Sequence, residues 1–402
     1  KPSYLQALGL TLARNDRGEP TRRIHALPAE ERTIAEALRE AGYFTALVGK
    51  WHCGEWLPEH LPMGQGFQHQ YGHYGWGIDY NNYTIPHNAP ARFAVYDWHR
   101  NQQPLCEQGY STDLFANEAV RLISQQSDHM PFFLYVPWSS PHSPVVPSKE
   151  WQGKSGLNPH ADFVMQTDDC FGQVVSALRD SGMIDNTLIL CSSDNGTSAP
   201  TSNMKQLNEL GHFPSGDLRG SKAEIWDGGH RVPFLVSWTG VVQPGSRSDG
   251  LVCLTDVTRT VADILQIELP TDAAEDSVSF LPLLQGGTEH ERHDVIHHSI
   301  SGYFAIRKDN WKLSLCPDSG GWTGTRPSKK SWAKLRKNAK PMVQLIDMDA
   351  DLGEQQNLAE SHSEKVDELK TLLREQVDRG RTTPGQRQSN DAKIVIEKSP
   401  RK

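Results

Sequence analysis

The sequence has no apolar run long enough to cross a bilayer, no excess of basic residues and no C-x-x-C pair. A transmembrane helix needs about 20 consecutive apolar residues, so no membrane span is expected. Acidic residues (49) outnumber basic ones (41), and the net charge of −8 argues against nucleic acid as a partner, because such binders carry a basic surface. The six cysteines show no zinc-site spacing with histidine. They leave the redox compartment open, and composition leaves the oligomeric state open.

The composition is that of an ordinary globular protein, with 37% hydrophobic and 22% charged residues in 402. Sequence periodicity predicts strands and helices in alternation over the first part of the chain. Such alternation predicts an α/β fold with a mainly parallel central sheet flanked by helices. The expected strands are 44–48, 132–136, 187–191 and 232–237, and the expected helices are 28–42, 113–124, 163–179 and 257–265.

The pattern changes after about residue 287, where short strand candidates follow one another closely. They predict a smaller C-terminal antiparallel sheet, with one helix over 363–377. The chain therefore divides into a main domain (1–288), a C-terminal subdomain (289–380) and a basic tail (381–402) that we expect to be disordered. Within the subdomain, 326–340 carries seven Lys or Arg residues and no acid, which favours a solvated loop.

The apolar run that begins at Leu188 stops abruptly at Asp194, Asn195 and Gly196. In α/β proteins, ligands gather beyond the carboxyl ends of the strands. Carboxylate and amide oxygens suit a hard cation such as calcium or magnesium better than zinc. The same three residues are also common in Asx turns, and this segment alone leaves both interpretations open.

Four more polar residues, namely Lys50, His52, His142 and Lys222, lie at predicted strand ends or in adjoining loops. If the segment after residue 48 stays extended, the first two point to the same side. Cleavage of a sulfate or phosphate ester needs cations that balance the charge of the oxygens, and an acid that protonates the leaving oxygen. Together with the Asp-Asn pair, the four side chains could surround such an oxyanion.

At these residues the chain resembles the sulfatase family of the alkaline-phosphatase superfamily. The shared motifs are Gly-Lys-Trp-His at 49–52, Pro-His-Ser-Pro at 141–144, Ser-Asp-Asn-Gly at 193–196, and Leu-Arg-Gly-x-Lys at 218–222 followed by Gly-Gly-x-Arg-Val-Pro at 228–233. Tyr-Ser-Thr-Asp at 110–113 and the acidic run at 345–354 resemble arylsulfatase A-like members. The similarity extends from about Thr33 to the end of the C-terminal sheet.

The resemblance implies a calcium-dependent sulfuric ester hydrolase. Asp194 and Asn195 match the second half of a site for one calcium ion. Lys50 matches the lysine that holds the nucleophile and a sulfate oxygen. His52 matches the histidine that helps the sulfated intermediate collapse. His142 and Lys222 match the pair that binds sulfate and assists departure of the alcohol.

One departure from the family concerns the nucleophile, a formylglycine made from the first residue of a C/S-x-P/A-x-R motif. None of the six cysteines begins such a motif, and the paired aspartates of the first strand are missing. Since Lys1 to Leu10 resembles the stretch that follows the nucleophile helix, we expect the motif to lie upstream of Lys1 and this fragment to be inactive. No initiator Met or secretory segment is present, while the resemblance implies a periplasmic, secreted or lysosomal location.

The expected substrate is a sulfated small molecule or a sulfated polysaccharide. His212 and Arg219, shortly before Lys222, are candidates for the alcohol side of the pocket, although His212 alone is equally compatible with a structural role. A phosphatase or phosphodiesterase of the same superfamily is an alternative. It is disfavoured by Asn195, because two-metal relatives carry His there. A non-catalytic binder of sulfated glycans, using the 326–340 cluster, is the other alternative.

Overall fold

The computed structural model describes residues 26–55, 57–84, 96–126, 130–288, 290–324, 342–390 and 393–398. Lys1 to Leu10 and the 326–340 cluster lie outside these ranges. Within them, no helix is both long and apolar enough to cross a membrane. The described helices of the main domain are α2 (Ile34–Glu40), α3 (Ser111–Gln125), α4 (Pro159–Asp180), α5 (Ala199–Ser202), α6 (Met204–Glu209), α7 (Asp256–Leu265) and α8 (Leu281–Leu284).

The central sheet is mixed, with its two parallel pairs side by side at one edge. Its order is β4-β3-β2-β1-β5, and β1 pairs in parallel with both β2 and β5, whereas β2–β3 and β3–β4 are antiparallel. The expected α/β fold is thereby confirmed. The strands are β1 (Phe44–Lys50), β2 (His69–His73), β3 (His99–Arg100), β4 (Gln103–Pro104) and β5 (Phe132–Tyr135).

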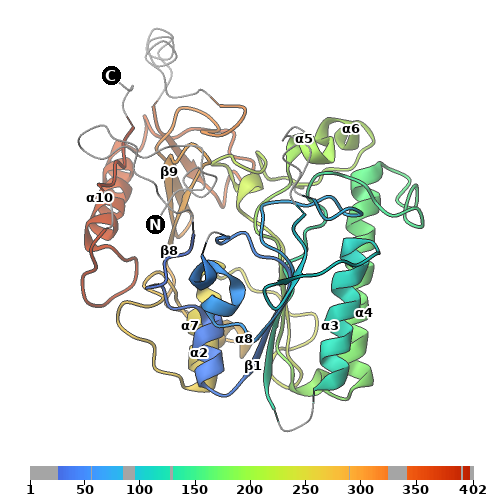
Figure 1. Ribbon diagram of the computed structural model, residues 1–402. Helices are drawn as coiled ribbons and strands as arrows, with labels where there is room; N and C mark the ends of the chain where they lie inside the picture. The colour runs from blue at the N-terminus through green and yellow to red at the C-terminus, as the bar shows by residue number, and fades with distance from the viewer. Residues whose placement is uncertain are drawn as a thin grey trace, which may run out of the picture.

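Strand β1 is buried on both faces, as a central parallel strand should be. Ala46 and Val48 pack with Phe115 of α3 on one face. Leu47 packs with Ala35 of α2 on the other face. Because side chains alternate along a strand, these two core clusters bind helices to opposite sides of the sheet (Figure 1).

Helix α2 begins later than the sequence pattern predicts. We expected a helix from residue 28, but the structure places Thr33 at the N-cap. The Thr33 hydroxyl accepts the Glu36 N–H at 3.1 Å, and the Glu36 carboxylate accepts the Thr33 N–H at 2.8 Å. This capping box satisfies two backbone donors that a helix start leaves unpaired, which explains why the helix begins here.

Strands β6 (Ile189–Ser192) and β7 (Phe234–Ser237) form a separate antiparallel pair. The two expected strands exist, but as this pair rather than as hydrogen-bonded members of the parallel sheet. Ile189 nevertheless packs on the cluster between α3 and α4 that also contacts Phe132 and Leu134 of β5. Strand β6 therefore lies on the same helix layer as β5.

The C-terminal subdomain is a four-stranded antiparallel sheet with one helix, as predicted. Leu313 and Leu345 of the sheet pack against Leu369 and Leu373 of the helix, and all four are fully buried. Figure 1 shows this helix at the far side of the subdomain. The elements are β8 (Asp294–His298), β9 (Phe304–Lys308), β10 (Trp311–Ser314), β11 (Gln344–Asp347) and α10 (Ser363–Arg379).

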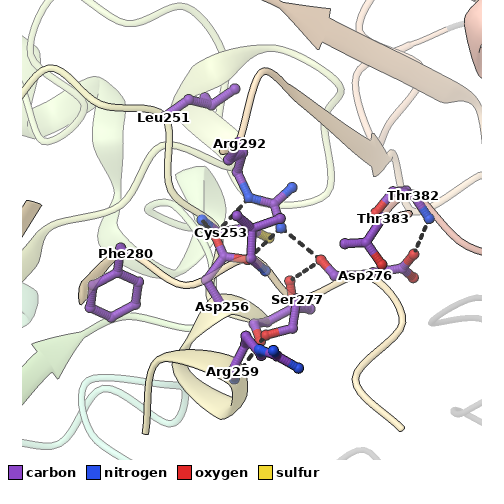
Figure 2. A network of polar contacts seen from close by, with 12 residues as sticks. Leu251, Cys253, Asp256, Arg259, Asp276, Ser277, Phe280, Arg292, Thr382 and Thr383 are labelled. Carbon is purple, nitrogen blue, oxygen red and sulfur yellow. Dashed lines mark hydrogen bonds and ion pairs between the residues drawn. The ribbon is translucent and has the colours of Figure 1, made fainter. Parts of the chain in front are cut away.

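A buried ion pair joins the two domains (Figure 2). Arg292, just before β8, donates to both carboxylate oxygens of Asp256 at the start of α7. Its guanidinium also donates to the carbonyl oxygens of Asp276 at 2.6 Å and Asp294 at 2.9 Å. The side chains of Arg292 and Asp256 are 4% and 0% exposed, so the junction is a fully desolvated polar contact.

The described part of the 381–402 tail is packed, contrary to the expected disorder. Arg381 is buried and donates to the Thr271 carbonyl at 3.0 Å, and the Thr382 N–H donates to the Asp276 carboxylate at 2.8 Å (Figure 2). Ile394 and Ile396 cover the core cluster of the C-terminal sheet. Composition alone did not reveal that carbonyl groups of the main domain offer partners for this basic segment.

Candidate active site

Lys50 is the last residue of β1, and His52 follows in the loop beyond it. The backbone there is anchored, because the Lys50 N–H donates to the Pro137 carbonyl and the His52 N–H to the Tyr74 carbonyl, both at 2.9 Å. His52 has a φ of 54°, so the segment is not extended as its pattern suggested. The expectation that both side chains point to the same side because of strand geometry therefore does not apply here.

His142 lies in the loop after β5, at the same edge of the sheet as Lys50. Its backbone N–H donates to the Ser139 carbonyl at 3.0 Å, and its Nδ1 lies 2.9 Å from the Ser143 carbonyl oxygen. Since a carbonyl only accepts, Nδ1 carries a proton. In the neutral ring, Nε2 is then the nitrogen that can accept.

Lys222 belongs to a loop formed by residues 219–231, which we call the Lys222 loop. Its backbone N–H donates to the Thr197 carbonyl at 2.9 Å, directly after the Asp194-Asn195-Gly196 turn. A Cβ atom on Gly196 would lie 1.9 Å from the Gly228 carbonyl oxygen. The absence of a side chain at Gly196 thus permits close backbone packing of the loop beyond the end of β6, where the Lys222 backbone lies.

The charges of these groups affect one another's pKa values, which indicates that the groups lie near one another. Burial, reinforced by the Lys222 ammonium and opposed by Asp194, lowers the pKa of Lys50 to about 8. Burial, followed by the charges of Lys50 and other nearby groups, lowers the pKa of His52 to about 3. Burial is also the main cause of the lowered pKa values of His142 and Lys222, and Asp194 opposes it in both.

The two lysines are half-buried cations without an ion-pair partner. Among the described residues, no carboxylate lies within 4.0 Å of the ammonium group of Lys50 or Lys222. Charged groups withdrawn from water are normally paired. Two such cations beside two neutral imidazoles form a site with a deficit of negative charge, which is suited to an anionic ligand.

Asp194 and Asn195 fit the role of partial ligands for a hard cation. The Asn195 amide nitrogen donates to the Gly196 carbonyl at 3.0 Å, which leaves the side-chain oxygen available. Asp194 is exposed, and its carboxylate accepts no hydrogen bond from a described residue. However, the described residues contain no group of three His, Cys, Asp or Glu side chains that could hold a metal. Since calcium takes six to eight oxygen ligands, these two residues supply a minority of them.

The structure places His212 and Arg219 less centrally. His212 is exposed, and its backbone N–H donates to the Leu207 carbonyl at 2.9 Å. The Arg219 guanidinium stacks on Trp226, 3.8 Å from the ring centroid, and donates to the Glu354 carbonyl at 2.6 Å. These contacts give Arg219 a structural role in the Lys222 loop, and its proposed contact with the alcohol stays a prediction.

His73, which the sequence pattern did not single out, belongs to the site. It pairs with Lys50 in the register of β1 and β2, and burial lowers its pKa to about 4. Its Nε2 lies 2.5 Å from the Ser139 hydroxyl, next to the loop of His142. The segment 69–73 is too polar to resemble a buried strand, and no local sequence pattern marks His73.

The arrangement of sheet, helices and strand-end residues is alkaline-phosphatase-like, and comparison with known proteins agrees. A solved structure from a study of glycosaminoglycan metabolism by Bacteroides thetaiotaomicron superposes with a TM-score of 0.71 at 26% identity, covering 88% of this chain and 83% of that one. The structure of Ps i-CgsB in complex with k-i-k-neocarrahexaose has the same fold, with a TM-score of 0.73 at 22% identity, over 96% of this chain and 82% of that one.

The chain belongs to the sulfatase family, whose model matches residues 7–267. It is 29% identical to an N-acetylgalactosamine-6-O-sulfatase of Bacteroides thetaiotaomicron, over 85% of this chain and 76% of that protein. It is 33% identical to the human N-acetylgalactosamine-6-sulfatase, over 66% of this chain and 51% of that protein. The chain thus spans about half the length of the human relative.

Proposed function

We propose that this chain forms the sulfate-binding and leaving-group half of a calcium-dependent sulfuric ester hydrolase. The observation that carries the proposal is the pair of half-buried cations Lys50 and Lys222, which have no carboxylate partner among the described residues and lie near His52 and His142 in a sulfatase fold. An ester of sulfate presents non-bridging oxygens that share negative charge. Preorganised cations bind such oxygens most strongly in a site from which water is largely withdrawn.

The two lysines would share the charge of the sulfate group. Lys50 lies at the end of β1 and Lys222 enters from the loop beside Thr197, so the two ammonium groups approach from different elements. A pKa of about 8 keeps most of the Lys50 population protonated at pH 7. Each ammonium can therefore donate to a sulfate oxygen without having to leave a carboxylate partner first.

The two histidines act as neutral groups near pH 7, because burial lowers both pKa values. His52, with a pKa of about 3, stays neutral and serves as a hydrogen-bonding partner rather than as a cation. His142 holds its Nδ1 proton on the Ser143 carbonyl, so in the neutral ring its Nε2 is an acceptor and has no proton to give. The leaving oxygen would therefore take its proton from the ammonium group of Lys222, which lies near His142.

The family uses two further groups, a calcium ion and a formylglycine. Asp194 and Asn195 would supply some of the ligands of the calcium ion, and the ion would supply positive charge to the sulfate and to the nucleophile. A formylglycine supplies the covalent nucleophile in this family, and no residue among 1–402 lies in the motif from which it is made. We therefore propose that residues 1–402 alone turn over a sulfate ester poorly or not at all.

We propose a sulfated glycan as the substrate, because the relatives above act on N-acetylgalactosamine 6-sulfate by name. The structure of another relative of the same fold holds D-glucosamine-2-N,6-O-disulfate. Location in a periplasmic, secreted or lysosomal compartment accompanies this proposal, since such glycans are extracellular materials. All six cysteines are unpaired in the structure.

The test compares a matched aryl sulfate and aryl phosphate, using a form of the protein that carries the nucleophile motif and, in parallel, residues 1–402. The longer form should prefer the sulfate by at least about 100-fold in kcat/KM and lose turnover when calcium is chelated, as expected for a site built around one hard cation. Preference for the phosphate would identify a phosphatase instead. If the longer form binds sulfated polysaccharide in a salt-sensitive way but shows no turnover, the protein is a glycan binder. Robust turnover by residues 1–402 would refute the proposal that the nucleophile is a formylglycine outside these residues.

Sulfate affinity should depend on pH through Lys50. A lysine with a pKa of about 8 is charged below that pH and neutral above it, so affinity should be highest below pH 8 and decline as the pH rises to 9.5. Loss of one charged hydrogen-bond donor costs about 1.5–3 kcal/mol, which corresponds to roughly 10- to 100-fold in Kd. Calorimetric titration of residues 1–402 with inorganic sulfate at constant ionic strength measures this. The Lys50→Met variant should bind weakly at every pH and lack the inflection near 8, whereas an unchanged inflection would assign it to another group.

A further inference from the structure

A buried ammonium group, that of Lys312, lies behind the Lys222 loop. Lys312 is the second residue of β10, and its side chain is 0% exposed. Its Nζ lies 2.7 Å from the Asp227 carboxylate and 2.8 Å from the Glu354 carboxylate. Asp227 belongs to the Lys222 loop, and Glu354 follows β11, so three separate segments meet at this one cation.

The lysine occupies the face of the C-terminal sheet that packs against the Lys222 loop, where Ile225 contacts Tyr303 and Ala305. Its neighbour Leu313 points to the opposite face and packs in the cluster with Leu369 of α10. Because side chains alternate along a strand, Lys312 must point away from α10. The Asp227 carboxylate that receives it is also bound by Arg231, whose Nη2 lies 2.8 Å away.

Glu354 binds the Lys222 loop through two hydrogen bonds and also contacts Lys312. Its carboxylate accepts the backbone N–H of Asp227 at 2.6 Å and contacts Lys312, and its own carbonyl accepts a guanidinium N–H of Arg219 at 2.6 Å. The Glu354 backbone has a φ of 50°, an unfavourable conformation for a residue other than glycine. Such a conformation persists only where surrounding contacts enforce it, as these contacts do.

We propose that Lys312 is a positioning residue for Lys222: its ammonium group, clamped between Asp227 and Glu354, fixes the Lys222 loop on the C-terminal sheet and thereby sets the place of the Lys222 side chain. This inference rests on the proposed function of Lys222 as a sulfate ligand. The Lys222 loop has only one short helical turn, Asp227–Gly229, so its shape depends on external contacts. A buried ion pair adds little net stability compared with apolar residues, whereas its directional bonds define one arrangement.

The test compares Lys312→Met with Leu369→Ala in residues 1–402. Leu369 is fully buried in the same subdomain but on the opposite face of the sheet, so its truncation destabilises the subdomain without touching the Lys222 loop. At a temperature where both variants are folded, Lys312→Met should raise amide exchange in residues 219–231 at least about tenfold. It should also weaken binding of inorganic sulfate about tenfold, because small displacements of a binding group are costly. Leu369→Ala should leave both within about twofold of the wild type.

In a form that carries the nucleophile motif, kcat for an aryl sulfate should fall about 100-fold with Lys312→Met. Equal effects of Lys312→Met and Leu369→Ala on loop exchange and sulfate binding would overturn the proposal and leave Lys312 a purely structural residue. If Lys312→Met does not fold, Glu354→Gln carries the same comparison, because it retains the Lys312–Asp227 bond. A wild type that fails to bind sulfate would contradict the proposed function instead, while amide exchange would still decide the role of Lys312.

Discussion

Replacement of Lys222 by alanine should abolish most sulfate ester turnover. In a form that carries the nucleophile motif, we expect kcat for an aryl sulfate to fall about 100- to 1000-fold, the usual effect of removing one preorganised donor from a developing negative charge. The loss should be large because the Lys222 ammonium has no carboxylate partner among the described residues and is withdrawn from water. Its entire electrostatic effect is therefore available to the ligand.

Lys205 provides the matched control for this experiment. It lies on α6, its side chain is 87% exposed, and it lies 3.8 Å from the Glu209 carboxylate. A surface pair of this kind contributes about 0–1 kcal/mol, so Lys205→Ala should leave kcat, KM and sulfate affinity unchanged. The smallest loss expected for removal of such a donor is about 100-fold. If Lys222→Ala instead retains more than about a tenth of the wild-type kcat, the assignment of Lys222 to the sulfate site is wrong.

Replacement of Asp256 by alanine should cost about 3–5 kcal/mol of unfolding free energy, as is typical when one partner of a buried ion pair is removed. Arg292 would remain as an uncompensated cation with a side chain that is 4% exposed. The backbone N–H groups of Cys253 and Val278 would also lose their acceptor, at present the Asp256 carboxylate at 2.8 and 2.9 Å. Figure 2 shows how this junction reaches the segment that begins at Thr382.

Urea denaturation monitored by circular dichroism measures this loss. Asp263, on the same helix, provides the control, because its pair with Arg259 at 3.1 Å has side chains that are 50% and 37% exposed. Asp263→Ala should cost at most about 1 kcal/mol. Equal losses for the two variants would show that the domain junction does not depend on the Asp256–Arg292 pair.

The strand-end residues were predictable because each motif is contiguous in the chain. An apolar run followed by polar residues specifies both a buried strand and the groups at its end, as at Leu188 to Gly196 and at Ala46 to His52. The backbone contacts of the Lys222 loop with Thr197, and the packing of Gly196 on Gly228, then bring the separate motifs together. Among the described strands, β6 and β7 nevertheless pair only with each other.

Strand β2 was not predicted, because its residues are polar. His69, Gln70 and His73 are buried, and their burial depends on partners that lie far away in the sequence. His69 contacts Glu118 of α3 at 2.8 Å, and His73 contacts Ser139. A pattern of hydrophobicity cannot report a polar residue whose desolvation is offset by a distant hydrogen bond.

By itself, the sequence determined the fold class, the family and the set of strand-end side chains, since all of these depend on local pattern and contiguous motifs. Only the tertiary structure decided that Lys312, in a Trp-Lys-Leu strand whose alternation suggests a solvent-facing lysine, is buried behind the Lys222 loop. It also decided that the described start of the basic tail, at Arg381 and Thr382, binds Thr271 and Asp276. In both cases a charged side chain is buried because acceptors from remote segments replace its water, and such pairing is not encoded in any single stretch of the chain.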